Sequence, residues 1–200
     1  MLAVEFFLGI TAFTCRIGPK TKFVYLVTTP NGETPSTYGD YRAIPGEHSD
    51  VIYASYNELH ALDSVHIPGG SWATNRNRLL AEVVYNERKC NSRPHYYIFL
   101  DDHMVRMQQN HSWALQFNIT LNANPYRSFE TFLTLWKPAL GVTSFKWHNS
   151  ACEVSCGTSR GTKACSLVNT LHNTDSVIHA FHRDAAKAVL LPYAQFLDVQ

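Results

Sequence analysis

The stretch HYYIFLDDHMV (residues 95–105) joins a run of aromatic and aliphatic residues directly to two carboxylates and an imidazole. The apolar run from Tyr96 to Leu100 is rich in aromatic and branched types, which predicts a buried strand in the middle of a sheet. Asp101, Asp102 and His103 follow at the carboxyl end of this strand. Ligands of open α/β sheets bind beyond the carboxyl ends of the strands. The stretch therefore predicts a central strand with a polar site at its end.

The segments before this strand favour an α/β sheet. Residues 22–29 and 50–56 have the Val, Ile and Tyr content of strands. Residues 72–89 place apolar side chains at helical spacing, which predicts a helix. The order strand, helix, strand favours parallel pairing through a crossover helix. We therefore expect an α/β fold with a mostly parallel central sheet flanked by helices.

The second half of the chain continues the same alternation. Residues 125–136 open with a proline and carry an apolar face, which predicts a helix. Strands are predicted over residues 139–147 and 176–183, and a further helix over residues 184–193. The length of the chain favours one domain and no internal repeat appears, so we expect residues 22–200 to form a single domain.

The two ends of the chain differ from the rest. Residues 1–21 form an apolar segment that carries Glu5, lacks a basic leader and is shorter than the roughly 20 apolar residues of a membrane-spanning helix. We interpret this segment either as a weak signal sequence, and so as a potential membrane anchor, or as a truncated first element of the fold. The chain stops at FLDVQ without a terminating signal, which predicts a C-terminal truncation.

Overall charge argues against a nucleic-acid partner. The formal net charge is +1, and the lysines and arginines are scattered along the chain. Proteins that bind duplex DNA usually carry a basic face or stripe. The composition therefore predicts a globular protein without nucleic acid as a partner.

Cysteines and glycosylation sequons indicate the compartment. Three cysteines cluster and two stand apart: Cys152, Cys156 and Cys165, and then Cys15 and Cys90. In an oxidising compartment, five cysteines predict one or two disulfides and a free thiol. Two N-x-Ser/Thr sequons begin at Asn110 and Asn118. Together these features favour the secretory pathway, in the lumen of the ER or Golgi.

The Asp-Asp-His triplet has a chemical and a structural interpretation. Asp101 and His103 offer a hard oxygen and a borderline nitrogen, which suit Mn²⁺ or Mg²⁺ bound together with phosphate oxygens. Such a cation would offset the charge that develops on a departing diphosphate. In the structural interpretation, the aspartates only cap the loop after the strand.

A resemblance to a known family joins these features. Residues 69–83, GGSWATNRNRLLAEV, and residues 96–103, YYIFLDDH, resemble nucleotide-sugar glycosyltransferases of the GT-A fold. In that family a glycine turn and an Arg- and Asn-bearing helix precede a strand that ends in an Asp-x-Asp metal motif. Residues 124–142 and 175–193 are similar to later segments of glycosyltransferase-like proteins. The departure is His103 where Asp is usual, and Asp-x-His is similar to the triplet of polypeptide N-acetylgalactosaminyltransferases.

The resemblance implies a donor site for a nucleotide sugar. Asp101 and His103 would hold the metal, and Asp102 would orient the metal or the ribose. The turn at Gly69 and Gly70 and the side chain of Arg76 would approach the diphosphate, aided by N–H groups at the start of the helix. Arg78 is the alternative to Arg76, and both could instead be solvated helix residues.

The acceptor side has three candidate residues. Asp175 is the candidate general base for an acceptor hydroxyl of a glycan, protein or lipid, and His179 and His182 are its alternatives or a further metal ligand. Because His179 and His182 are three apart in a predicted strand, at most one of them faces the site.

Two other functions compete with sugar transfer. A catalytically silent member of the family would act as a glycan-binding or scaffold module. A zinc-stabilised interaction module would use His148 together with the three clustered cysteines as ligands.

Overall fold

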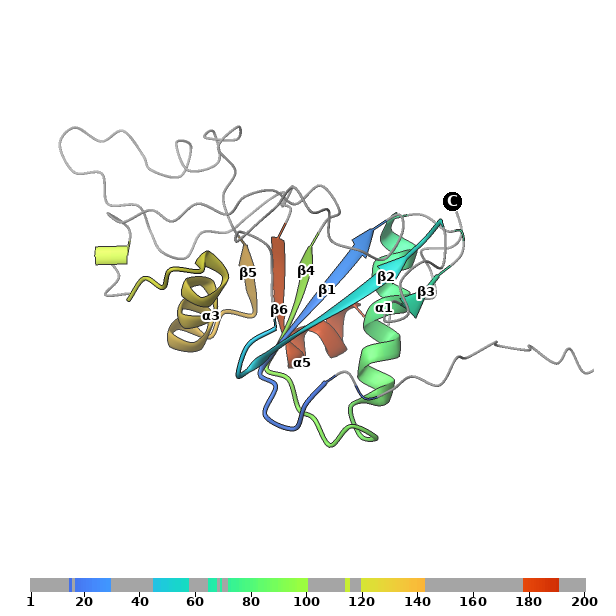
Figure 1. Cartoon of the computed structure of the whole chain (residues 1–200), viewed down its shortest axis with the longest axis horizontal. Helices are drawn as coiled ribbons and strands as arrows, with labels where there is room; N and C mark the ends of the chain where they lie inside the picture. The colour runs from blue at the N-terminus through green and yellow to red at the C-terminus, as the bar shows by residue number, and fades with distance from the viewer. Residues whose placement is uncertain are drawn as a thin grey trace, which may run out of the picture.

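The structure is a computed structural model that describes residues 15, 17–29, 45–57, 65–67, 69, 72–100, 114–115, 120–142 and 178–190. Within these ranges the chain forms one six-stranded sheet flanked by helices, which confirms the α/β class (Figure 1). The strands are β1 Phe23–Thr29, β2 Ser49–Ser55, β3 Val65–His66, β4 Tyr96–Leu100, β5 Leu140–Val142 and β6 Ile178–His182. None of the described helices has the length and apolarity needed to cross a membrane.

The sheet has the strand order β3-β2-β1-β4-β6-β5 and is mixed. Strands β3, β2, β1 and β4 pair in parallel, whereas β6 is antiparallel to both β4 and β5. The expectation of a mostly parallel sheet was therefore wrong for the half that contains β6 and β5. Because Ile178, the first residue of β6, lies opposite Leu100, the last residue of β4, the chain enters β6 from the carboxyl edge of β4. A parallel strand would need a crossover back to the other edge.

Strand order reverses at β1. The chain builds outward from β1 through β2 to β3, and helix α1 (Trp72–Asn86) then returns it to β4 on the other side of β1. The expected parallel arrangement through a crossover helix is confirmed, with β4 pairing with β1 from Phe23–Tyr96 to Val27–Leu100. Such a reversal point is where ligands of open α/β sheets bind.

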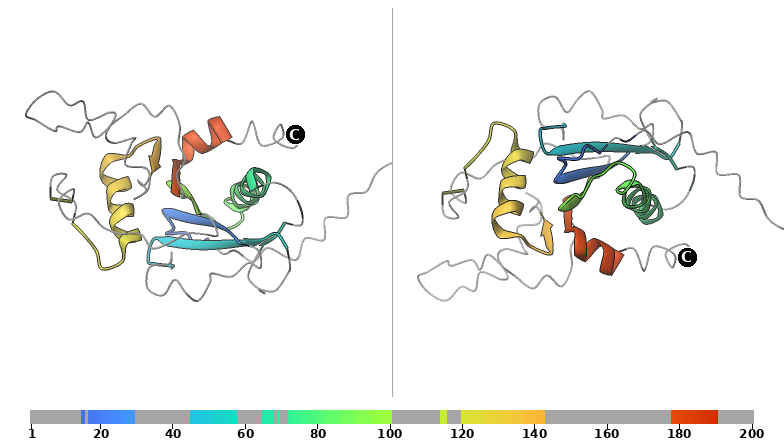
Figure 2. Two further views of the ribbon diagram at one scale, coloured as in Figure 1. Left: turned by 90° about the horizontal axis from the view of Figure 1, so that it is seen from above. Right: turned by 90° about the horizontal axis from the view of Figure 1, so that it is seen from below.

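Helices cover both faces of the sheet (Figure 2). Helix α3 (Pro125–Trp136) packs on one face; α1 and a π-helical segment η2 (Ala186–Leu190) pack on the other. Alternate residues of each strand enter the two cores, as the two-residue period of a strand requires. In β4, Tyr97 and Phe99 face α1, whereas Ile98 faces α3. The predicted last helix appears as the short α5 (Arg183–Ala185) followed by η2, and residues 191–193 lie outside the described residues.

A buried glutamate fixes α3 to the sheet. The hydroxyls of Tyr25 in β1 and Ser49 in β2 donate to Glu130 Oε1 at 2.8 and 2.7 Å. Arg127, one turn earlier in α3, pairs with the same carboxylate. Burial and the neighbouring Glu130 carboxylate raise the pKa of Tyr25 well above its usual value, so this hydroxyl stays protonated and remains a donor.

A second buried glutamate fixes the helices on the other face to the sheet. Glu87, just after α1, is 3% exposed and accepts a hydrogen bond from the Tyr97 hydroxyl of β4. Arg183 of α5 and Lys187 of η2 pair with its other oxygen at 2.7 and 2.9 Å. Both helical layers are therefore held to the central strands by a tyrosine and a carboxylate, as well as by apolar packing.

Candidate functional site

The candidate site is the carboxyl edge of the sheet where β1 and β4 lie side by side. Thr29 of β1 lies opposite Ser55 of β2, whereas β4 ends earlier, with Leu100 opposite Val27. Helix α1 begins at the same edge, because it follows β3 and runs back toward the start of β4. The sequence places the Asp-Asp-His triplet directly after Leu100; Asp101, Asp102 and His103 themselves lie outside the described residues.

Gly69 lies between β3 and α1, where the sequence predicts a glycine turn. Gly69 has φ +67°, in the left-handed region that residues with a Cβ rarely adopt, so glycine is the favoured residue there. Gly70 lies outside the described residues.

The two arginines of helix α1 lie in different environments, one buried and one exposed. Arg76 is 7% exposed, and its Cζ lies 5.5 Å from the centroid of the Phe99 ring in β4. A guanidinium at this distance from a ring is held by a cation–π interaction. Arg78, two residues later, is exposed. Of the two arginines that the sequence offered, Arg76 is therefore the one that the fold places over β4.

Two buried polar side chains that the sequence had not singled out lie at this edge. Asn75 is 5% exposed and neighbours Arg76 in α1, and its Oδ1 atom has no hydrogen-bond partner among the described residues. The buried hydroxyl of Thr29, at the end of β1, likewise has no hydrogen-bond partner among the described residues. Buried polar atoms are normally hydrogen-bonded. Because Asn and Thr are common in helix starts and strands, nothing in their spacing marked them out.

The two candidate histidines lie at opposite ends of β6. His179 lies opposite Phe99, faces α1, is 9% exposed and stacks on Phe181 with ring centroids 6.3 Å apart. His182 lies opposite Tyr96 at the amino end of β4, and its Nδ1 accepts a 3.4 Å hydrogen bond from the Asp184 N–H. His179 thus shares a face and an edge with Arg76, and His182 shares neither.

The remaining sequence candidates fall outside the described residues. These are Asp175 and the zinc alternative formed by His148, Cys152, Cys156 and Cys165. Within the described part of the chain, no three His, Cys, Asp or Glu side chains gather closely enough to hold a metal ion. The other two cysteines, Cys15 and Cys90, are joined in a disulfide.

Comparison of the chain with protein-family models, curated protein sequences and solved structures gives no match. The functional interpretation therefore rests on the carboxyl edge itself. This edge combines the strand-order reversal, a left-handed glycine before a helix, and a buried guanidinium and a buried imidazole on the same face of the sheet.

Proposed function

We propose that this protein is a metal-dependent glycosyltransferase of the GT-A type, which moves a sugar from a nucleotide-diphosphate donor to a hydroxyl acceptor. One observation carries the proposal. The strand whose sequence runs directly into Asp101, Asp102 and His103 is β4, and β4 lies at the point where the strand order reverses. Ligands of open α/β sheets bind in the crevice beyond the strand ends at such a point.

The triplet supplies the ligands for a divalent cation. Asp101 and His103 would hold Mn²⁺ or Mg²⁺, and Asp102 would contribute to the same ion or orient the ribose. When bound, the cation neutralises the charge that develops on the departing diphosphate. Because an imidazole must be neutral to bind a metal, metal binding through His103 should weaken as the pH falls below about 6.5.

The start of α1 supplies the diphosphate contacts. Arg76 is held over Phe99 on the face of β4 that α1 covers, and a guanidinium binds phosphate oxygens through charge-assisted hydrogen bonds. The turn at Gly69 and Gly70 precedes the helix start, where N–H groups point toward an anion. Asn75 adds a buried side-chain amide at the same position.

The acceptor side uses β6 or the residues just before it. Asp175 and His179 are the candidates for the general base that accepts the proton of the acceptor hydroxyl. His179 lies opposite Phe99, next to the end of β4. His182 lies at the other end of the strand and is left out of this role.

The test is a thermal-stability measurement of the full chain with UDP, GDP or CMP, each with and without Mn²⁺. A nucleotide at a hundred times its dissociation constant stabilises the folded state by about 2.7 kcal/mol, which is a shift of about 5 to 10 °C for a domain of this size. We expect one nucleotide to give this shift only when Mn²⁺ is present. The shift should be lost in Asp101→Asn and in His103→Gln.

Two pairs of variants in the described residues serve as matched controls. Arg76→Gln should weaken nucleotide binding about tenfold or more, whereas Arg78→Gln on the exposed face of the same helix should not. Arg76→Lys keeps the positive charge at this position. Comparison of its nucleotide binding with that of Arg76→Gln distinguishes loss of the charge from an effect on folding. His179→Gln should lower the rate of sugar transfer with little change in nucleotide affinity, whereas His182→Gln should leave both unchanged.

The same measurements distinguish the rival functions. If no nucleotide shifts the melting temperature with or without Mn²⁺, the proposed transferase is wrong and the silent glycan-binding or scaffold module takes its place. If chelators unfold the protein without any nucleotide effect, the zinc-stabilised module is the better description.

A further inference from the structure

A polar pocket lies at the opposite edge of the sheet from the candidate site. It has a volume of about 470 Å³ and is formed by the residues just before β1, β2 and β4. Its lining includes five basic or imidazole side chains, namely Lys20, Lys22, His48, Arg93 and His95. None of the described residues that line it is acidic. Because β1 is seven residues long, about 20 Å separate this pocket from the carboxyl edge.

Backbone hydrogen bonds hold the lining segments together. The N–H groups of Lys22 and Phe23 donate to the carbonyl of His48 at 2.8 and 3.0 Å. The N–H groups of His95 and Tyr96 donate to the carbonyl of Lys22 at 2.7 and 3.1 Å. Three lining residues from distant parts of the sequence are therefore fixed next to one another where β2, β1 and β4 begin.

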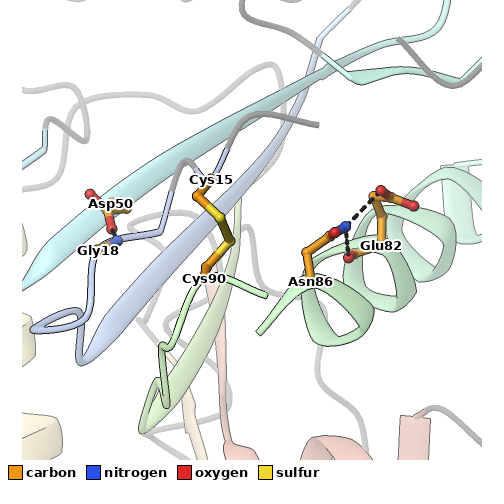
Figure 3. The surroundings of a disulfide bond; sticks show 6 residues. All are labelled: Cys15, Gly18, Asp50, Glu82, Asn86 and Cys90. Carbon is orange, nitrogen blue, oxygen red and sulfur yellow. Dashed lines mark hydrogen bonds between the residues drawn. A yellow bond between two sulfur atoms is a disulfide. The ribbon is translucent and has the colours of Figure 1, made fainter. Parts of the chain in front are cut away.

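A disulfide and a carboxylate fix the loops around the pocket. Cys15 and Cys90 join the segment before β1 to the loop after α1, and those two loops lie at the same end of the sheet (Figures 1 and 3). Asp50 Oδ2 accepts a hydrogen bond from the Gly18 N–H at 2.9 Å (Figure 3). The same oxygen accepts another from the Thr21 hydroxyl. The Asp50 carboxylate, which accepts from the lining residue Thr21, thus shapes the turn that carries Lys20.

The local electrostatics favour a negatively charged ligand. Partial desolvation lowers the pKa of His95, and the charges of Lys22, Lys137 and Arg183 together with the nearby imidazole of His182 lower it further. The cations that surround this imidazole therefore disfavour another positive charge. Besides Asp50, the pocket has Glu47 as an acidic neighbour, and the exposed carboxylate of Glu47 lies 3.8 Å from His48 Nε2.

We infer that this basic pocket at the amino edge binds a tetrahedral oxyanion, the phosphate or sulfate group of a polar ligand. Lys22 and Arg93 would carry the charge-assisted hydrogen bonds, and His48 and His95 would donate from their imidazole nitrogens. The volume exceeds that of the oxyanion alone, so the group can belong to a larger molecule. The inference is independent of the proposed transferase, because it concerns the opposite edge of the sheet.

The test is a titration of the full chain with inorganic phosphate and, separately, with sodium sulfate, at constant ionic strength set by sodium chloride. Amide NMR signals of residues 20–22, 91–93 and 95 report binding, and phosphate and sulfate are compared to identify the preferred oxyanion. We expect saturable shifts that are confined to the pocket. The double variant Lys22→Gln/Arg93→Gln should bind about tenfold or more weakly.

A matched control removes a charge outside the pocket. Lys89, which lies after α1 and stacks on Tyr85 with its Nζ 4.8 Å from the ring centroid, does not line the pocket. Lys89→Gln should bind phosphate or sulfate as the wild type does. The midpoint of urea unfolding, measured for each variant without added oxyanion, shows that the fold is retained.

The outcomes distinguish specific binding at the pocket from a general effect of salt. Saturable binding that the double variant loses and Lys89→Gln keeps supports the pocket. Shifts that grow without saturation, or that are equal in all variants, mean an adventitious ion only and overturn the inference. Because the readout uses neither a nucleotide nor turnover, its failure is distinguishable from failure of the proposed transferase.

Discussion

Glu87 shows how a single buried residue connects separate parts of this fold. It accepts from the Tyr97 hydroxyl and pairs with Arg183 and Lys187, which come almost 100 residues later in the chain. Removing this carboxylate would leave the buried Tyr97 hydroxyl without its acceptor and the partly buried Arg183 and Lys187 without their partner. The residue is therefore expected to contribute far more to stability than an exposed carboxylate does.

We predict that Glu87→Ala lowers the free energy of unfolding by about 3 kcal/mol, because it leaves two cations and a buried hydroxyl unpaired. Urea unfolding followed by circular dichroism measures the change. Glu47→Ala, at a carboxylate whose side chain is 82% exposed, is the control and should change stability by less than about 0.5 kcal/mol. Equal effects of the two substitutions would contradict the role assigned to Glu87.

His95 should make stability depend on pH. Its pKa in the folded state is lowered, so the unfolded chain takes up a proton more readily than the folded protein does. The contribution is fully present above about pH 6.5 and is lost as the pH falls from there through the folded pKa. We expect the stability difference between wild type and His95→Gln to shift against the wild type between pH 7.5 and pH 5, in buffers free of phosphate and sulfate. A difference that stays constant across this range would count against the prediction.

At the scale of elements, α3 has a start that is defined by its own sequence. The side chain of Asn124 accepts a hydrogen bond from the Tyr126 N–H at 2.9 Å, and Pro125 occupies the first helical turn. The helix ends at Trp136, and the next residue, Lys137, has φ +46° and donates its N–H to the Leu133 carbonyl at 3.0 Å. These local signals explain why the predicted and observed bounds agree.

We predict that Asn124→Ala destabilises the protein by about 1 kcal/mol, because the Tyr126 N–H loses its acceptor. Asn124→Asp keeps an acceptor oxygen at the same position and is the matched control, with little loss of stability expected. Urea unfolding of the two variants under one set of conditions makes the comparison. If aspartate proved as costly as alanine, the capping hydrogen bond would not be the cause.

At the scale of the whole molecule, the Cys15–Cys90 disulfide closes a large covalent loop. The two cysteines are 75 residues apart, and the loop includes β1, β2, β3 and α1. A crosslink over this separation removes conformational freedom from the unfolded chain. It therefore stabilises the parallel half of the sheet.

We predict that Cys15→Ser/Cys90→Ser lowers the free energy of unfolding by about 4 kcal/mol on the chain-entropy model. The measurement is urea unfolding of wild type and variant, each with and without a thiol reductant. Cys152, Cys156 and Cys165 are present in both proteins, so their contribution cancels in the comparison. A reductant that destabilises both proteins equally would show that this crosslink is not the stabilising one.

Local sequence patterns predicted most of the described elements. Strand β4 and helix α3 have the predicted bounds, and β1 differs from its prediction by one residue. Strand β3 was missed because two residues are too few to show a period. The π-helical turns of η2 were predicted as an ordinary helix, because both have an apolar pattern of similar spacing.

For the candidate site, the sequence determined which chemical groups are present. Neighbouring residues are enough to predict a strand that runs into Asp101, Asp102 and His103. They also predict a glycine turn before an arginine-bearing helix, because hydrophobic period and turn chemistry are local properties. Only the tertiary structure decided that Arg76 rather than Arg78 lies over β4, and that His179 rather than His182 lies at the carboxyl edge. Those choices, like the direction of β6 and the basic pocket, depend on pairing between residues far apart in the chain, which no local pattern contains.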